Sequence, residues 1–310
     1  MDLPFRSKNG RGTVGLDIDG RYLAAVQTAA GRIQTAASGQ LTPGLVVEGE
    51  VADVSALSAE LKDFFRRTSL PRQVRLGVAN QKISVRELEL PMIEDEREQA
   101  AAVRFQAAEA VAMPLDEAVL DYQVIGESRT AEGSPRLRVV VVAAQEGMIN
   151  ALVEAVRGAG LKPVGIDLNA FAVVRALAPA EPDVEGPARA YVHLGGVPNL
   201  ALAAGSSCVF TRALSVAEDP EAYAASLGEQ IRLSIDYYRV QPDARFVEEI
   251  VISGPVSAQP GLAESLAQTA GLPVTVAEPL GGMSASSLPP GEEPQLYTVA
   301  TGLALGEAAA

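Results

Sequence analysis

The chain has 310 residues, is 48% hydrophobic and carries a formal net charge of −14, so it is long enough for about two compact domains with hydrophobic cores. Nucleic-acid binding usually relies on clustered Lys and Arg, and this acidic balance therefore argues against DNA or RNA as a partner. A single cysteine, Cys208, excludes an intrachain disulfide, and a single histidine, His193, leaves too few ligands for a zinc site. Both counts fit a reducing compartment.

The N-terminal segment, residues 1–12, has basic residues but no apolar stretch behind them. We expect it to be a flexible N-terminus and not a signal peptide. The longest plainly apolar run, Val139 to Ala144, is far shorter than the roughly 20 residues that span a bilayer. These features predict a cytoplasmic protein without direct membrane insertion, which is peripheral to the membrane only through partners.

Three apolar segments with a period of two follow one another from Thr13: TVGLDI, RYLAAVQT and RIQTAASG. They predict a three-strand meander. Asp19-Gly20, between the first two segments, has the composition of a two-residue hairpin turn, whose two central positions need positive φ. A helix from Val54 to Arg67 and the strand QVRLGVA are predicted to follow.

A different pattern comes next and predicts an inserted subdomain over about residues 86–145. It consists of a strand from Glu87 to Pro91, a helix from Glu94 to Val111, and the strands VLDYQVIG and RLRVVVVAA. We expect the apolar residues of this helix, with Val103 and Phe105 among them, to pack on the strands. After a helix from Glu146 to Gly158 and the segment GLKPVGIDLNAFAVVRAL, the stretch Pro179 to Pro187 is the predicted linker.

The first pattern then occurs a second time. The segments AYVHL, LALAA and CVFTRAL predict another meander, which is followed by a helix from Glu218 to Tyr238, the strand EEIVISG and an amphipathic segment from Gly261 to Ala270. Repetition of one βββαβα unit predicts two related lobes that face each other across a cleft, as in actin and the sugar kinases. We assign residues 13–178 to the first lobe and residues 188–310 to the second.

Several motifs, in order, match one family. RELELPMIEDEREQAAAVRFQAAEAVAMPLDEAVLDYQVIG looks like the family's insert, GLKPVGIDLNAFAVVRAL like its next segment, and FTRALSV, QIRLSIDYY and VATGLAL like its second lobe, from about Val14 to Leu305. On these motifs the chain resembles the PilM-type proteins of type IV pilus assembly. The resemblance implies an α/β, actin-like (ribonuclease H-like) fold of two lobes, with an FtsA-type inserted subdomain in the first lobe.

The resemblance also implies a function and a partner. In this family the short N-terminal tail of PilN, an inner-membrane protein, docks in a groove between the core and the insert of the first lobe. The chain is accordingly expected to be a cytoplasmic scaffold for a PilN-like protein, with self-association left open. Residues of the partner groove remain unassigned, although the second face of the insert helix is a candidate border.

The implied fold holds ATP or ADP with magnesium between two hairpin turns, where backbone N–H groups and a nearby Ser or Lys neutralise the phosphates. By the resemblance, Asp17 would face the metal through water, and Asp19 and Gly20 would form the first turn. The family pattern resembles GLDIG followed by Ser-rich residues and a Lys. Here the segment is GLDIDGRYLA, in which no Ser follows Gly20 and Ala24 stands where the Lys is expected.

The second turn and the base side of the site depart from the pattern as well. Gly195 and Gly196 would form the second turn, but His193 replaces its metal-facing Asp, and an imidazole is a poor ligand for magnesium. Gln230 stands where the family has a Glu near the ribose, with Glu229 one residue away. Gly254 would mark the adenine side, before a proline that lacks a backbone donor. We predict a degenerate cleft, at most a weak ATPase, and no catalytic residue.

Each of these residues also has a purely structural interpretation. Asp19-Gly20 is then an ordinary turn, Asp17 a strand-end hydrogen-bond acceptor, Gly195-Gly196 a flexible hairpin, His193 a buried polar group and Cys208 a buried inert thiol. The competing function is an active actin-like ATPase that couples nucleotide state to assembly. An FtsA-like membrane filament is disfavoured, because no Lys or Arg follows Arg245 to build a basic amphipathic C-terminal helix. Pilus assembly, DNA uptake and a related secretion machine all stay open.

Overall fold

The computed structural model describes residues 13–29, 32–130, 133–179, 186–217, 219–241, 244–277, 288 and 292–306. The predicted N-terminal segment and residues 180–185 of the predicted linker lie outside these ranges. The chain divides into two compact units, one of residues 81–153 and one of residues 1–80 together with 154–310.

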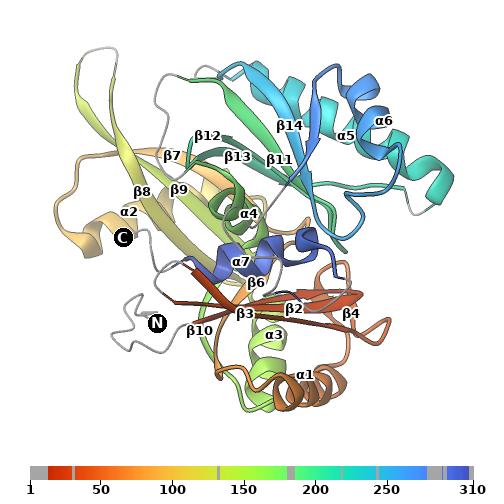
Figure 1. The fold of residues 1–310 in the computed structure, drawn as a ribbon. Coiled ribbons are helices and arrows are strands. Elements are labelled where there is room, and N and C mark those ends of the chain that lie inside the picture. The colour runs from red at the N-terminus through yellow and green to blue at the C-terminus, as the bar shows by residue number, and fades with distance from the viewer. Residues whose placement is uncertain are drawn as a thin grey trace. The chain divides into compact units, whose positions relative to one another are not determined.

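The larger unit contains two five-stranded sheets of the same topology (Figure 1). The first has the order β10-β6-β1-β2-β3, in which β1, β2 and β3 form the predicted meander and β6 and β10 run parallel to β1. Its strands are β1 (Val14–Asp19), β2 (Tyr22–Ala29), β3 (Arg32–Gln40), β6 (Gln73–Val78) and β10 (Lys162–Leu168). A small hairpin of β4 (Val46–Val47) and β5 (Glu50–Val51) and the helix α1 (Val54–Thr68) join β3 to β6.

The predicted helix α1 begins at a side-chain cap and buries one face. Asp53 Oδ1 accepts a hydrogen bond from the backbone N–H of Ala56 at 2.9 Å, which satisfies a donor that the first turn leaves unpaired. Leu57, Leu61 and Phe64, spaced at i, i+4 and i+7, are buried. Their spacing lays one apolar stripe of the helix against the core.

The first hairpin turn lies one residue later than predicted. Asp19 pairs with Tyr22, so Gly20 and Arg21 are the central residues, and neither has a positive φ. The prediction of a turn centred on Asp19 and Gly20 with two positive φ values is therefore wrong. A Cβ on Gly20 would lie 2.9 Å from the carbonyl oxygen of Val46, so this position needs glycine for close approach and not for its φ.

The second sheet has the order β13-β12-β11-β14-β15 and confirms the predicted repeat. Its strands are β11 (Ala188–His193), β12 (Asn199–Ala204), β13 (Ser207–Ala213), β14 (Val247–Ser253) and β15 (Val274–Val276). Two helices, α5 (Pro220–Arg239) and α6 (Leu262–Ala270), pack on it. Leu227 and Ile231 of α5 and Leu266 of α6 join the strand residues in one buried cluster.

Two short helices, α4 (Asn169–Leu177) and α7 (Thr298–Ala304), lie between the two sheets (Figure 1). A Cβ on Gly15 of β1 would lie 2.0 Å from the carbonyl oxygen of Ala300, and one on Gly302 would lie 1.8 Å from that of Ala172. Helix α7 therefore sits directly on β1 and on α4. The sequence analysis assigned the stretch that contains α7 to the second lobe, yet Ala300 and Ala304 of α7 pack on β2 of the first sheet. The lobe boundaries stay predictions. A 3-10 turn, η2 (Pro294–Tyr297), leads into α7.

The smaller unit is a three-stranded antiparallel sheet covered by one helix. The order is β7-β9-β8, with β7 (Ser84–Pro91), β8 (Ala118–Arg129) and β9 (Pro135–Gln145), and α3 (Glu146–Gly158) follows. Helix α2 (Glu96–Ala110) buries Val103 and Ala107 against β9, as predicted. Phe105, however, is 74% exposed. The expectation that it packs on the strands is wrong, because a residue two positions from Val103 points to the opposite side of a helix.

Among the helices that the structure describes, we find none that combines the length and the apolar character required to span a bilayer.

Candidate functional site

The turn of the first lobe meets the turn of the second through one carboxylate. Asp19 Oδ2 accepts a hydrogen bond from the backbone N–H of Gly196 at 2.5 Å. A Cβ on Gly195 would lie 2.2 Å from Asp19 Oδ2, and one on Gly196 would lie 2.4 Å from Oδ1. Both glycines are therefore needed for the backbone to approach the carboxylate.

Asp17 lies behind this contact and is 1% exposed. The Tyr22 hydroxyl donates to its Oδ2 at 3.5 Å, and Ala24, which stands in place of the expected Lys, is its cross-strand partner. Burial and then the negative charge of Asp19 raise the pKa of Asp17 well above its ordinary value, whereas the Tyr22 hydroxyl lowers it. Burial also raises the pKa of Asp19, against the opposing effect of the Gly196 N–H.

In the second lobe, His193 stands where the family resemblance places a metal-facing Asp. It is 1% exposed, and its Nδ1 lies 3.2 Å from Oγ of Ser253, its partner on β14. Its Nε2 has no hydrogen-bond partner within the described part of the chain. Burial lowers the pKa of His193 to about 4, so the ring is neutral at physiological pH. These features favour the interpretation of His193 as a buried polar group.

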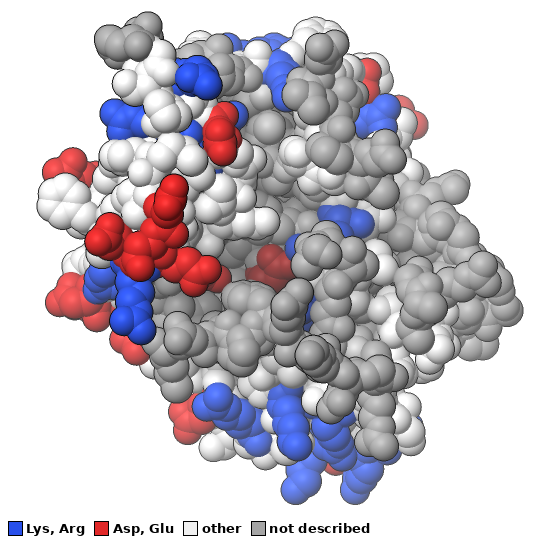
Figure 2. Space-filling view, turned by 90° about the vertical axis from the view of Figure 1, so that its left-hand side faces the viewer, with Lys and Arg blue, Asp and Glu red and all other residues white. Residues whose placement is uncertain are grey.

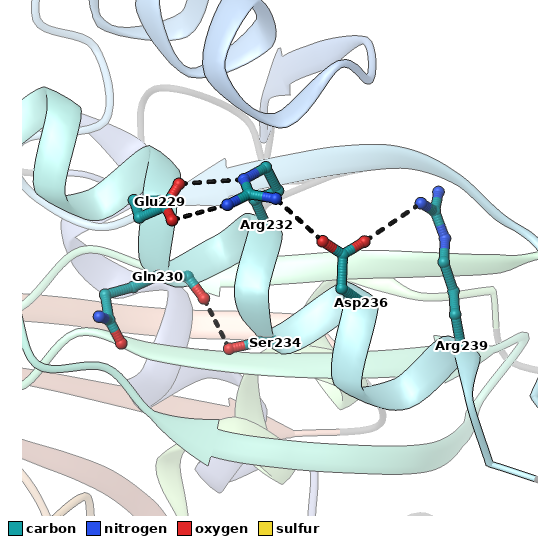
Figure 3. A network of polar contacts seen from close by, with 6 residues as sticks. All are labelled: Glu229, Gln230, Arg232, Ser234, Asp236 and Arg239. Carbon is teal, nitrogen blue, oxygen red and sulfur yellow. Dashed lines mark hydrogen bonds and ion pairs between the residues drawn. The ribbon is translucent and has the colours of Figure 1, made fainter.

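The structure brings five of the predicted site residues together, packs Gly254 behind the second turn and places Gln230 on α5. Asp17, Asp19, Gly20, Gly195 and Gly196 gather at the junction of the lobes. Gly254 has φ +97°, and a Cβ there would lie 2.8 Å from the carbonyl oxygen of Leu194, so it packs behind the second turn. Gln230 is half-buried on α5, and its backbone carbonyl accepts from Oγ of Ser234 at 2.7 Å (Figure 3).

The sequence analysis did not assign Tyr22 or Ser253 to this junction. Strand pairing is the feature that could have indicated both residues. A two-residue turn after Asp19 sets Tyr22 opposite it, and the parallel register of β11 and β14 sets Ser253 beside His193. Neither pairing follows from the composition of the turns alone.

The remaining side chains to consider for chemistry are the Cys208 thiol and the residue types that bind metals. The Cys208 thiol donates to the carbonyl oxygen of Phe210 at 3.5 Å, and burial raises its pKa to about 12, which favours the interpretation as an unreactive thiol. No group of three or more His, Cys, Asp or Glu side chains suited to a metal occurs among the described residues.

The surface charge is unevenly distributed. Figure 2 shows a group of Lys and Arg side chains at its lower end, the end at which α1 lies in Figure 1. Helix α1 contributes exposed Lys62, Arg66 and Arg67, and Arg157 lies in the last turn of α3. Cations in the last turn of a helix are favoured by its dipole, which gives a structural reason for three of these four residues.

A family model described as type IV pilus assembly protein PilM matches residues 15–189 and 220–308. The chain belongs to the PilM family. This membership confirms the resemblance inferred from the ordered motifs. A search of curated proteins found no match.

Solved structures similar to this PilM-family chain span nearly its whole length. A chain of the PilM-PilN type IV pilus biogenesis complex is 24% identical, with 97% of this chain and 100% of that chain covered and a TM-score of 0.82. The ethanolamine utilization protein EutJ from Carboxydothermus hydrogenoformans is 13% identical, with coverages of 94% and 89% and a TM-score of 0.54. MreB5 of Spiroplasma citri bound to ADP is 11% identical, with coverages of 97% and 99% and a TM-score of 0.52. At these identities the likeness shows the fold, and the predicted two-lobed actin-like α/β fold is confirmed.

Proposed function

We propose that this PilM-family chain is a cytoplasmic scaffold of a type IV pilus assembly machine or a related secretion machine, and that it binds the N-terminal tail of a PilN-like inner-membrane protein. The observation that carries the proposal is the match to PilM along most of the sequence. The likeness to a chain of the PilM-PilN complex supports it, because that likeness covers 97% of this chain and so includes the insert.

We further propose that the cleft between the turns is degenerate and does not hold magnesium with ATP or ADP. The Gly196 N–H already has an anionic acceptor in Asp19, where a phosphate of a bound nucleotide would need that donor. No cation compensates the carboxyl groups of Asp17 and Asp19 at the position of the expected Lys, because that residue is Ala24. The neutral ring of His193 supplies no carboxylate for a magnesium shell.

The outer face of α2 is our candidate for a contact with the tail. Phe105 is 74% exposed there, while Val103 and Ala107 on the other face pack on the sheet of the insert. A large aromatic side chain that the fold itself does not bury is the kind of anchor that dominates peptide binding. It offers an apolar contact to an apolar residue of the tail.

The test is a titration with a fluorescent peptide that carries the cytoplasmic tail of the neighbouring single-span membrane protein. We expect saturable binding in the micromolar range and a loss of at least about tenfold in affinity for Phe105→Ser. Phe246→Ser is the matched control, because Phe246 is 69% exposed but lies in the second lobe. Absence of binding at micromolar peptide would overturn the scaffold proposal, and equal effects of the two substitutions would remove Phe105 from the contact.

A further inference from the structure

Helix α5 presents an apolar stripe to solvent. Leu233 and Tyr237 of α5 and Val240, the residue that caps its C-terminus, are 42%, 60% and 81% exposed. Their spacing of four and three residues sets them on one face of the helix, while Leu227 and Ile231 on the other face belong to the core of the second lobe. Exposed apolar side chains that gather in this way are typical of a surface that binds another protein.

The ring of Tyr237 packs beside another aromatic ring of the second lobe. Its ring centroid lies 5.9 Å from that of Phe210 on β13, with the rings tilted by 44°. The Phe210 ring also lies 6.2 Å from the ring of Tyr238. A packed aromatic ring loses little conformational freedom on binding, and such residues are frequent hot spots of interfaces.

A row of alternating charges runs along α5 (Figure 3). Arg232 Nη2 lies 2.7 Å from Glu229 Oε1, Arg232 Nη1 lies 3.2 Å from Asp236 Oδ2, and Arg239 Nη1 lies 3.5 Å from Asp236 Oδ1. Glu229 precedes Leu233 by four residues, and Asp236 precedes Val240 by four, so row and stripe are neighbours on the helix. Exposed pairs of this kind contribute little to stability and can exchange partners.

The row is complementary to itself in one arrangement. Glu229 and Arg239 are equally distant along the helix from Ser234, and so are Arg232 and Asp236. Two antiparallel α5 helices that cross at the level of Ser234 therefore set Glu229 opposite Arg239 of the second copy, and Arg232 opposite its Asp236. Parallel helices related by a two-fold axis would bring identical charges to the same level.

We propose that α5 forms the contact between two copies of this chain, packed antiparallel about a two-fold axis at the level of Ser234. The apolar stripe is the centre of this interface, with Tyr237 as its anchor, and the charge row sets its register. The surface is self-complementary, which is what a two-fold contact requires and what an unrelated partner does not need.

Two variants with opposite charge patterns test the proposal. In Glu229→Arg with Asp236→Arg the row is entirely positive, and in Arg232→Glu with Arg239→Glu it is entirely negative. We expect the wild type to dimerise in the micromolar range by sedimentation velocity, each variant alone to stay monomeric, and an equimolar mixture to form the heterodimer. Ion pairs within one α5 helix cannot explain formation of the heterodimer, because the charge row of each variant has a single sign and so contains no such pairs.

A single substitution tests the anchor. Tyr237→Ala should weaken the dimer by about tenfold or more, while Val276→Ala, at a 37% exposed apolar position on β15, should leave it unchanged. Circular dichroism checks that each variant is folded. A wild type that stays monomeric at the highest concentration, dimerisation of the separate charge variants, or a mixture that gives no heterodimer would each overturn the proposal. Binding of the tail peptide by Tyr237→Ala should match the wild type, so the outcome is independent of the scaffold function.

Discussion

Asp17 lies in an environment that penalises its charged form. Its side chain is buried, and Asp19 adds a second negative charge nearby, so the pKa of Asp17 lies well above its ordinary value. A carboxyl group whose pKa is raised in the folded state keeps its proton there while the unfolded chain releases it. Its effect on stability is therefore most favourable at acid pH, and stability declines as pH rises through the folded pKa.

We predict that Asp17→Asn is more stable than the wild type at about pH 7.5 and that the two converge near pH 3.5. Each unit by which the pKa is raised corresponds to about 1.4 kcal/mol, and the amide removes this cost while it can still accept from Tyr22. Urea unfolding at several pH values measures the difference. Asp63→Asn, at an exposed carboxylate paired with Arg66, is the control and should show no such gain. A loss of stability in Asp17→Asn at pH 7.5 would contradict the prediction.

His193 gives the opposite pH dependence. Its pKa is lowered to about 4 by burial, so the unfolded chain binds a proton in the range between about pH 6.5 and 4 that the folded chain does not. The stability that His193 contributes is complete above pH 6.5 and is lost as pH falls through this range, by about 3 kcal/mol in total.

Because the chain has one histidine, its ring can be followed by NMR without any substitution. We predict that the imidazole C–H signals stay constant from about pH 8 to pH 5.5. Unfolded protein in urea serves as the reference and should titrate near pH 6.5. A midpoint near that value in the folded protein would show that His193 is accessible to water.

At the level of elements, the two sheets are joined by helices that approach the backbone without intervening side chains. Gly302 of α7 faces the carbonyl oxygen of Ala172 on α4, where a Cβ would lie at 1.8 Å, and Gly15 of β1 faces that of Ala300. Glycine at both positions therefore sets the distance between the helices and the first sheet. Protein interiors of this density do not accept an added methyl group without displacement.

We predict that Gly302→Ala lowers the free energy of unfolding by about 1–3 kcal/mol, since the backbone of α4 has to shift. Gly147→Ala in α3 is the matched control, because nothing lies within 4 Å of a Cβ there. That change should be neutral or stabilise by up to about 1 kcal/mol through helix propensity. Chemical denaturation of both variants decides the matter, and similar effects of the two would argue against close packing at Gly302.

For the whole molecule, the proposal of a degenerate nucleotide site implies that nucleotide stabilises the folded chain little, because Asp19 already accepts from the Gly196 N–H. A ligand present at 100 times its Kd stabilises a protein by about 2.7 kcal/mol, which raises the Tm by several degrees. We predict that millimolar Mg·ADP shifts the Tm by less than about 1 °C and that EDTA has no effect. Phosphate release should not exceed that of Asp17→Ala, and turnover above this control would instead support the ATPase alternative.

Much of the architecture could be predicted because its signals are local. The period of two in TVGLDI or LALAA and the helical spacing in α1 arise from neighbours along the chain, and the order of the family motifs identified PilM. The first turn was misplaced by one residue because the contact of Gly20 with Val46 is not local. Phe105 was misassigned because apolar character alone does not say which face of α2 is covered.

The sequence by itself determined the repeated lobes, the insert between them and the departures of the nucleotide turns from the family pattern. Only the tertiary structure decided which residues of the two turns meet. Asp19 and Gly196 are 177 residues apart in the chain, and no periodicity relates them. The Gly196 N–H of the second turn donates to the Asp19 carboxylate of the first, because folding of the two sheets around α4 and α7 brings both turns to one place.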